Sequence, residues 1–204
     1  MSEAHAQTLA ERQRRLLALL KMRETAEAQV DPRLKEVALS RGLKALQEID
    51  YFWKEYSIVS RCPFTAGLMR TEGVLREAVT GLIREERVSP FIEEMACQFL
   101  ERASNNANPL IATVARFERA LTATAEGDPA EHRIEWEQDP YYVLSSLLNH
   151  QTIDPTASRG HFVTVVSAQF EERFRVAERR LRDRGDQIRE GQSASVDPSG
   201  NADS

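Results

Sequence analysis

The sequence has few cysteines, no long hydrophobic run and no surplus of positive charge. Its two cysteines, Cys62 and Cys97, set no disulfide framework and lack the spacing of zinc ligands, so we expect two reduced thiols. The longest apolar run near the N-terminus, Leu16 to Leu20, is only five residues long. A signal peptide needs a longer run, and a membrane span needs about 20 residues. These absences predict a cytoplasmic protein.

The balance of charge argues against a surface that follows nucleic-acid phosphates. The chain of 204 residues has a formal net charge of -5, with 41% hydrophobic and 29% charged residues. Such a composition is typical of an ordinary globular protein, and the length suffices for one sizeable core or for a core with a small appendage. The acidic balance makes nucleic acid an unlikely partner.

No recognisable catalytic or metal-binding motif is present. GxSxG, HExxH, P-loop and GxGxxG patterns are all missing. Adjacent carboxylates, as in Glu93-Glu94, diverge by about 100° around a helix and so favour a solvated face over an acid/base pair. The four histidines are scattered without ligand spacing: His5, His132, His150 and His161. We therefore expect no catalytic residue and no metal site in this chain.

The residues before Gly127 predict a bundle of about five helices. Proline-containing breaks separate segments with helical spacing, at Asp31-Pro32, Cys62-Pro63, Ser89-Pro90 and Asn108-Pro109. The segment from about Thr8 to Gln29 and that from Phe64 to about Glu86 are each expected to be one helical region, although glycines weaken the second. Trp53 and Tyr56 are expected to be core or interface anchors, because large aromatics supply burial more often than chemistry.

The helix predicted between Asn108 and Gly127 is central to the chain. Asn108 suits its cap, and Gly127 suits its end. Four apolar side chains recur at helical spacing along one face: Leu110, Val114, Phe117 and Leu121. Glu118 lies beside this face, and we expect it to form a structural salt bridge with another helix.

After Gly127 the pattern changes toward β-structure. His132 to Glu137 alternates as a strand with one wet face, and His161 to Val166 is the most β-favouring stretch of the chain. Phe170, Phe174, Ala177 and Leu181 return to helical spacing. The prediction is a mostly helical α+β protein with three parts: a helical bundle (1–127), a small α+β domain with a short sheet (128–184) and a disordered tail (185–204).

Two strands alone form a marginal sheet in water, so these two need a third strand, a helix cover or a partner. An apolar free edge of a small sheet is a place where an extended peptide can add itself as a further strand. The provisional peptide-binding residues are those of the second strand: His161, Phe162, Val163, Thr164, Val165 and Val166.

Three runs carry a family resemblance: FIEEMACQFL followed by a polar loop and VARFERAL, then EWEQDPYYVLSSLL, then HFVTVVSAQFEERFRV. In this order they resemble the accessory subunits of multinuclear iron enzymes in ribosomally synthesised peptide (RiPP) biosynthesis. Those of the methanobactin and 3-thiaglutamate pathways (MbnC and TglI) are the best known, and HvfC-type proteins are more distant kin. The similarity covers about Trp53 to Arg175.

The resemblance implies a helical N-terminal domain, a small C-terminal sheet domain and a heterodimer with a TIM-barrel iron oxygenase. That enzyme modifies a cysteine of a precursor peptide. In the family, the accessory subunit carries no metal ligands and is implicated in engaging the leader of the precursor. The iron cofactor would then belong to the partner enzyme and none to this chain, and no membrane is involved.

Two alternatives remain open. A DNA-binding or transcriptional regulator is suggested by six arginines in the expected terminal helix: Arg173, Arg175, Arg179, Arg180, Arg182 and Arg184. Interleaved acidic residues favour an ion-paired, exposed helix as the simpler interpretation. The second alternative is an independent enzyme that uses a bound metal.

Overall fold

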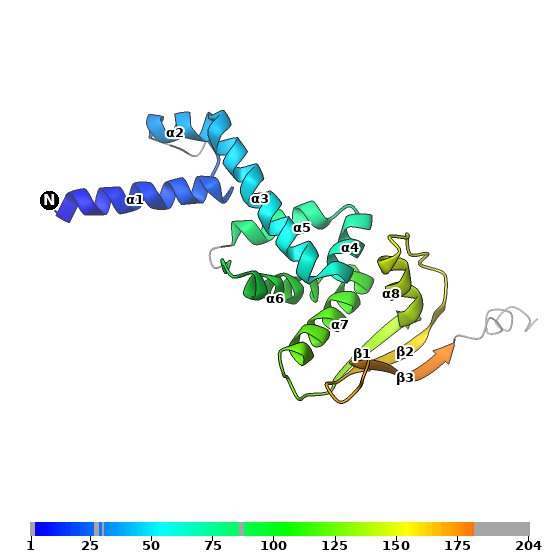
Figure 1. The fold of residues 1–204 in the computed structure, drawn as a ribbon. Coiled ribbons are helices and arrows are strands. Elements are labelled where there is room, and N and C mark those ends of the chain that lie inside the picture. The colour runs from blue at the N-terminus through cyan, green and yellow to red at the C-terminus, as the bar shows by residue number, and fades with distance from the viewer. Residues whose placement is uncertain (1–2, 27–28, 30, 86–87, 182–204) are drawn as a thin grey trace, which may run out of the picture.

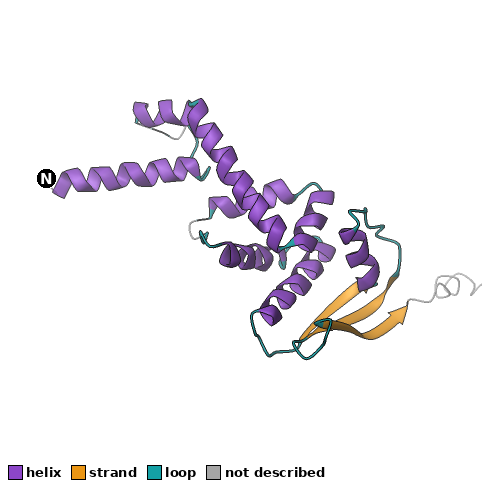
Figure 2. Cartoon of the chain, in the orientation of Figure 1, coloured by secondary structure: helices purple, strands orange, loops and turns teal. Residues whose placement is uncertain are grey.

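The computed structural model describes residues 3–26, 29, 31–85 and 88–181. Eight helices and three strands occur in this part of the chain, which is a mostly helical α+β fold as the sequence predicts (Figures 1 and 2). The helices are α1 (Glu3–Leu20), α2 (Pro32–Leu39), α3 (Arg41–Arg61), α4 (Pro63–Thr71), α5 (Leu75–Arg84), α6 (Ile92–Ala103), α7 (Pro109–Ala125) and α8 (Pro140–Leu148). The strands are β1 (His132–Gln138), β2 (Arg159–Val166) and β3 (Phe174–Leu181).

Three of the helices begin with the same local device. At the start of α2, α7 and α8, an Asp or Asn side chain accepts a hydrogen bond from the backbone N–H two residues later, and proline occupies the first turn. Proline suits this position because the N–H that it lacks would have no partner inside the helix. The cap residues are Asp31, Asn108 and Asp139.

The single helical region expected from Phe64 to Glu86 is two helices, α4 and α5. Gly73 separates them with a φ of 73°, a left-handed conformation that glycine adopts without strain. The N–H of Val74 bonds the carbonyl of Met69 at 2.9 Å, and that of Gly73 bonds the carbonyl of Arg70 at 3.1 Å. These two bonds satisfy carbonyls at the end of α4 and reverse the chain into α5.

The first two helices and the first half of α3 form an arm that projects from the rest of the molecule (Figure 1). Leu19, Leu34 and Leu43 are buried within the arm and lie outside the main core. The first helix ends at Leu20, several residues before the predicted end near Gln29.

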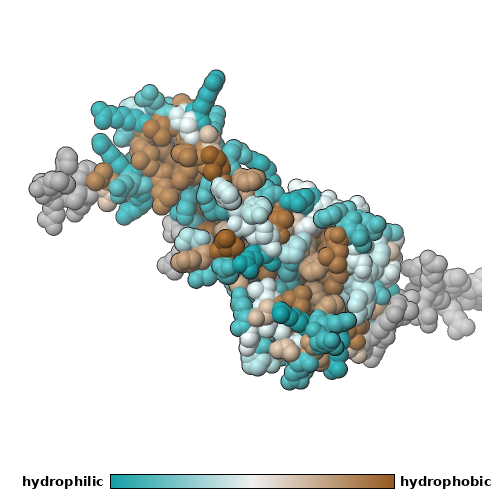
Figure 3. Space-filling view, in the orientation of Figure 1, coloured by the Kyte–Doolittle hydropathy of each residue, from teal (hydrophilic) through white to brown (hydrophobic). Residues whose placement is uncertain are grey.

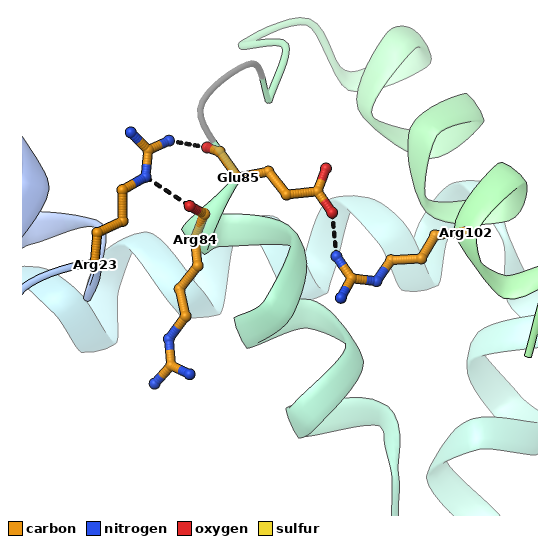
Figure 4. A network of polar contacts seen from close by, with 4 residues as sticks. All are labelled: Arg23, Arg84, Glu85 and Arg102. Atoms are coloured by element: carbon orange, nitrogen blue, oxygen red, sulfur yellow. Dashed lines mark hydrogen bonds and ion pairs between the residues drawn. The ribbon is translucent and has the colours of Figure 1, made fainter.

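A polar network joins the arm to the body at the end of α5 (Figure 4). The guanidinium of Arg23 donates to the carbonyl oxygens of Arg84, at 2.6 Å, and of Glu85. The carboxylate of Glu85 pairs in turn with Arg102 of α6. Because the last carbonyls of a helix have no partner within it, Arg23 supplies the hydrogen bonds that α5 cannot provide for itself.

The main core is continuous from α3 to the sheet and does not end at Gly127. Phe117 of α7 is fully buried, and its ring meets Trp136 of β1 and Phe174 of β3 edge to face, with centroids 5.4 and 5.1 Å apart. The predicted helical bundle and α+β domain therefore share one apolar interior. The predicted disordered tail lies outside the described residues.

The sheet is antiparallel, with strand order β1-β2-β3. The terminal helix predicted from Phe170, Phe174, Ala177 and Leu181 is wrong, because Phe174 to Leu181 forms β3 and pairs with β2. Phe174 pairs with Val166 and Val176 with Thr164, so apolar residues two apart in β3 lie on the core face of the sheet. The third strand and the cover by α7 provide the support that two strands lack.

Candidate functional site

The six residues predicted to bind a peptide lie in β2, the middle strand of the sheet. Residues of β2 pair with β1 along one edge and with β3 along the other. The expectation of a free edge at His161 to Val166 is therefore wrong, because both rows of backbone hydrogen-bonding groups face a neighbouring strand. No further strand can add to this segment without displacing one that is already there.

The side chains of these residues serve the sheet itself. Phe162, Thr164 and Val166 lie on the core face, where the indole N–H of Trp136 donates to Thr164 Oγ1 at 3.0 Å. Val163 and Val165 are buried on the opposite face of the strand. His161 is the exposed member of the set.

Within the described residues β1 is an outer strand of the sheet, as β3 is, and β1 borders a groove. Two hollows, of about 550 and 720 Å³, share Arg116 of α7 and Glu135 of β1 and together follow the length of this strand. One is lined by residues 135–138 and the other by residues 131–135. Because consecutive strand residues point to opposite faces, hollows lined by unbroken runs of residues reach the edge of the strand.

Beside the C-terminal end of β1, the floor of this groove is apolar. Leu110, Trp136, Ile153 and Pro155 line it. The amide of Gln138 donates to the carbonyls of residues 154 and 157, at 2.8 and 2.9 Å, and so fixes the loop that follows α8 against the end of β1. The groove therefore has a hydrogen-bonded wall at this end.

Charges of both signs surround the apolar floor. The hollow is bordered by Glu72, Arg116, Glu135, Glu137, Arg159 and His161. The carboxylate of the exposed Asp154 in the loop accepts hydrogen bonds from the hydroxyl and the N–H of Thr156, and these bonds lower its pKa. A mixed rim around an apolar floor fits a polypeptide segment better than a polyanion.

Glu118 does not form the predicted salt bridge. It is buried, and its two carboxylate oxygens accept the backbone N–H groups of Phe64 and Thr65, each at 2.9 Å. The N-cap residue of α4, Cys62, makes no side-chain cap hydrogen bond. Glu118 therefore supplies from α7 the cap that α4 lacks, and its negative charge lies at the favourable end of the helix dipole.

The environment of Glu118 marks a structural group. Burial raises the pKa of its carboxyl, while the hydrogen bonds from Thr65 and Phe64 act in the opposite direction. A raised carboxyl pKa is also common among catalytic acids. Here both oxygens are occupied by backbone groups of the neighbouring helix, and Glu118 lines none of the hollows along β1.

The two cysteines are free thiols, as expected. Cys62 is fully buried, and its pKa is raised by burial and then by the negative charge of Glu118. Its Sγ–H points to the carbonyl of Ala96 at 3.9 Å. Cys97 is half-buried, and burial raises its pKa as well. Neither environment favours the reactive thiolate.

The strand pairing does not bring His132 and His161 together. His132 lies opposite Val166, at the far end of the β1–β2 ladder from His161. Its Nε2 lies 3.1 Å from the carboxylate of Asp128. Within the described residues, no group of three His, Cys, Asp or Glu side chains is placed to hold a metal ion.

No helix in the described part of the chain has the length and apolarity needed to cross a bilayer. The chain matches no protein-family model, no curated protein and no solved structure. The class of molecule shown here is a mostly helical α+β protein with a groove beside an edge strand. The resemblance to accessory subunits of iron enzymes depends on the sequence motifs alone.

Sequence reasoning missed the groove along β1 because it depends on the order of the strands. Alternation of Ile134 and Trp136 with charged neighbours identifies a strand with one wet face, but it does not say which edge remains free. A better signal is the alternation of Phe174 and Val176 with arginine and alanine, a period of two that is typical of a strand.

Proposed function

We propose that this chain is a non-catalytic partner subunit of an iron-dependent TIM-barrel oxygenase in RiPP biosynthesis, acting in the cytoplasm. In this proposal the iron belongs to the partner enzyme. This chain engages the leader of a precursor peptide while the enzyme modifies a cysteine of that peptide. The sequence runs that resemble accessory subunits supply the choice of partner and reaction.

The observation that carries the peptide-binding part is the groove between α7 and the edge strand β1. An extended segment that adds to an edge strand gains backbone hydrogen bonds, and its alternate side chains enter adjacent hollows. In support of this, β1 is an outer strand of the described sheet, and the hollow beside it is lined by apolar residues such as Leu110 and Pro155 and by charges of both signs. We therefore propose that the peptide binds along β1 and not along β2, both of whose edges are paired with neighbouring strands.

Reconstitution tests the division of roles. The chain is co-expressed with a multinuclear iron enzyme of the barrel class and a cysteine-containing precursor from the same gene neighbourhood. The proposal expects a stable heterodimer, iron bound by the enzyme, and modification that requires both chains. Separate purification of the two proteins together with full activity of the enzyme alone would show that the assignment is wrong.

Amide hydrogen exchange locates the peptide without a mutation. Binding of the precursor leader should slow exchange of amides in β1 and leave those of β3 unchanged, because strand addition protects the outward N–H groups of one edge. Slower exchange in β3 alone would place the peptide at the other edge. Unchanged exchange in both strands would exclude strand addition.

A matched pair of charge reversals provides a second readout. Arg116→Glu adds a carboxylate beside Glu135 inside the groove, and we expect it to weaken leader binding by about tenfold. Arg175→Glu makes the same change on exposed β3 and should leave binding unaltered. If both variants weaken leader binding equally, the effect comes from the net charge of the protein and not from a local site in the groove.

The alternative of DNA binding loses the observation on which it depended. This alternative was suggested by the arginine-rich segment as an expected terminal helix. Residues 174–181 of this segment form β3, in which Arg175 packs its guanidinium over the Phe170 ring at 4.3 Å from the centroid. Salt-dependent binding of the purified chain to duplex DNA would revive this alternative.

A further inference from the structure

The exposed face of α3 carries an unusual set of side chains. Trp53 and Tyr56, expected as core or interface anchors, are not in the core: each is 59% exposed. Phe52, Leu46 and Ile49 are exposed to a similar degree. The rings of Phe52 and Trp53 lie 5.7 Å apart, and those of Trp53 and Tyr56 lie 6.2 Å apart. Large apolar surface of this kind marks an interaction site.

This face lies on the side of α3 opposite its buried residues. Leu43, Tyr51 and Ile58 point into the protein and recur at helical intervals. Leu46, Ile49, Trp53 and Tyr56 follow one another at steps of three, four and three, which is the spacing of a coiled-coil seam. We call these four residues the α3 seam. Its spacing fits a helix lying lengthwise against α3.

The spacing of the α3 seam is the same when the helix is read in either direction. Position 51 lies midway between Ile49 and Trp53, and it also lies midway between Leu46 and Tyr56. The same centre relates Gly42 to Ser60, two small exposed residues that continue the seam spacing. If two copies of α3 pair in antiparallel fashion about this centre, each aliphatic side chain meets an aromatic one. Small residues then meet at both ends of the contact.

The charges beside the α3 seam are neutralised within the chain. Glu48 pairs with Arg76 at 3.0 Å, Glu55 pairs with Arg70 at 3.2 Å, and Asp50 pairs with Lys54. The chain is acidic overall, so contact between two copies would ordinarily bring like charges together. Because all three acidic residues of α3 are paired within the chain, repulsion between like charges on two α3 helices is reduced.

The arm carries further exposed apolar residues. Figure 3 shows hydrophobic residues gathered over the arm, where α1 and α2 pack against α3. The exposed apolar residues of these two helices are Leu9, Leu16, Leu17, Val37 and Leu39. The α3 contact from Gly42 to Ser60 spans about 27 Å at 1.5 Å per residue. A stable interface buries about 800 Å² on each partner, and the arm enlarges the area that a second copy can cover.

We propose that the α3 seam binds a second copy of this chain through an antiparallel, two-fold symmetric helix pair centred on position 51. The residue types favour a second copy, because reversal places each aliphatic residue of the seam opposite an aromatic one and small residues at both ends, and because the acidic residues of α3 are already paired within the chain. The two-fold operator makes the contact isologous, so association stops at the dimer. This inference is independent of the proposed peptide site, which lies on β1 and α7.

Sedimentation of the full chain tests the dimer and its register. The wild-type chain should be a dimer at micromolar concentration. Ile49→Lys and Trp53→Glu should each weaken dimerisation by at least about tenfold, because each places two charges in the apolar contact. Both positions are exposed, and circular dichroism should confirm an unchanged helical content. Leu148→Lys, at an exposed leucine of α8 outside the α3 seam, should remain dimeric.

A mixture of the two seam variants tests the antiparallel pairing. Position 49 of one copy lies opposite position 53 of the other, so the introduced lysine meets the introduced glutamate and a mixed dimer should form. A parallel pair would not produce this rescue. Failure of the mixture to associate would overturn the proposed register. If the wild-type chain stays monomeric up to about 100 µM, the α3 seam does not bind a second copy and the proposal is wrong. This holds whether or not the chain binds vesicles or an iron enzyme through this face.

Discussion

Glu118 and Thr65 are 53 residues apart in the sequence, and the Oε2 atom of the first accepts the backbone N–H of the second at 2.9 Å. The contact joins the middle of α7 to the first turn of α4. Burial raises the pKa of this carboxyl in the folded state above its value in the unfolded chain. The folded protein therefore holds a proton at pH values at which the unfolded chain has lost it.

The first prediction concerns the pH dependence of stability. Stability falls with rising pH wherever the folded state binds more protons, so the contribution of Glu118 is full below about pH 4.5 and is lost as the pH rises through the folded pKa. Glu118→Gln has no such titration. We expect the free energy of unfolding of the wild type, minus that of this variant, to decrease above pH 4.5 in urea titrations. A difference that grows with pH would show that hydrogen bonding, not burial, controls this carboxyl.

The second prediction concerns the core between helix and sheet. Phe117→Ala should lower the free energy of unfolding by about 3–5 kcal/mol, because it removes a fully buried ring in contact with Trp136 and Phe174. Leu148→Ala, at a position 65% exposed, should change it by no more than about 0.5 kcal/mol. Urea unfolding followed by tryptophan fluorescence compares the two. Equal stability of both variants would mean that this contact is not part of the core.

The third prediction uses two glycines that both have space for a Cβ atom but differ in backbone conformation. A Cβ added at Gly67 or at Gly73 would meet no atom within 4 Å, but only Gly73 has a positive φ. Gly67→Ala, inside α4, should stabilise the protein by about 0.4–1 kcal/mol, whereas Gly73→Ala should destabilise it by about 1 kcal/mol or more. Thermal melts of the pair provide the measurement. Changes of the same sign would contradict the turn described at Gly73.

The fourth prediction concerns the thiols. Iodoacetamide should modify Cys97 well before Cys62, because Cys62 is fully buried and Cys97 is half-buried. Both reactions should be slower than that of a free thiol at pH 8, since burial raises both pKa values and lowers the thiolate fraction. Mass spectrometry after timed quenching measures the order. Early modification of Cys62 would indicate that the α3–α4 junction opens.

Local rules predicted the helical character of the residues before Gly127 and several helix starts, although seven described helices are found there in place of about five. The Asp-Pro and Asn-Pro pairs mark helix starts because the side chain and the proline ring act on the first turn alone. Gly127 closes α7 with a φ of 100° for an equally local reason. The segment from Phe174 to Leu181 was predicted wrongly, because its apolar residues fit both periods and only pairing with β2 selects the strand.

The candidate site depended more on tertiary structure. The strand at His161 to Val166 was predicted correctly, but its place in the middle of the sheet follows from β3, which the helical interpretation had removed. Glu118 was predicted to form a salt bridge with another helix; it does contact another helix, α4, but forms no salt bridge there. The partner was a row of backbone N–H groups, which no side-chain pattern in the sequence reveals.

The meeting of Phe117 with Trp136 and Phe174 has a consequence for the movement of the sheet. Phe117 of α7 contacts a ring from each of the two outer strands, so movement of β1 or β3 away from α7 would break a buried aromatic contact. We therefore expect local opening of the sheet and local opening of the helical bundle to occur together. A chain cut after Gly127 would expose Phe117 on one fragment and Trp136 and Phe174 on the other. We expect each fragment to aggregate unless the other is supplied.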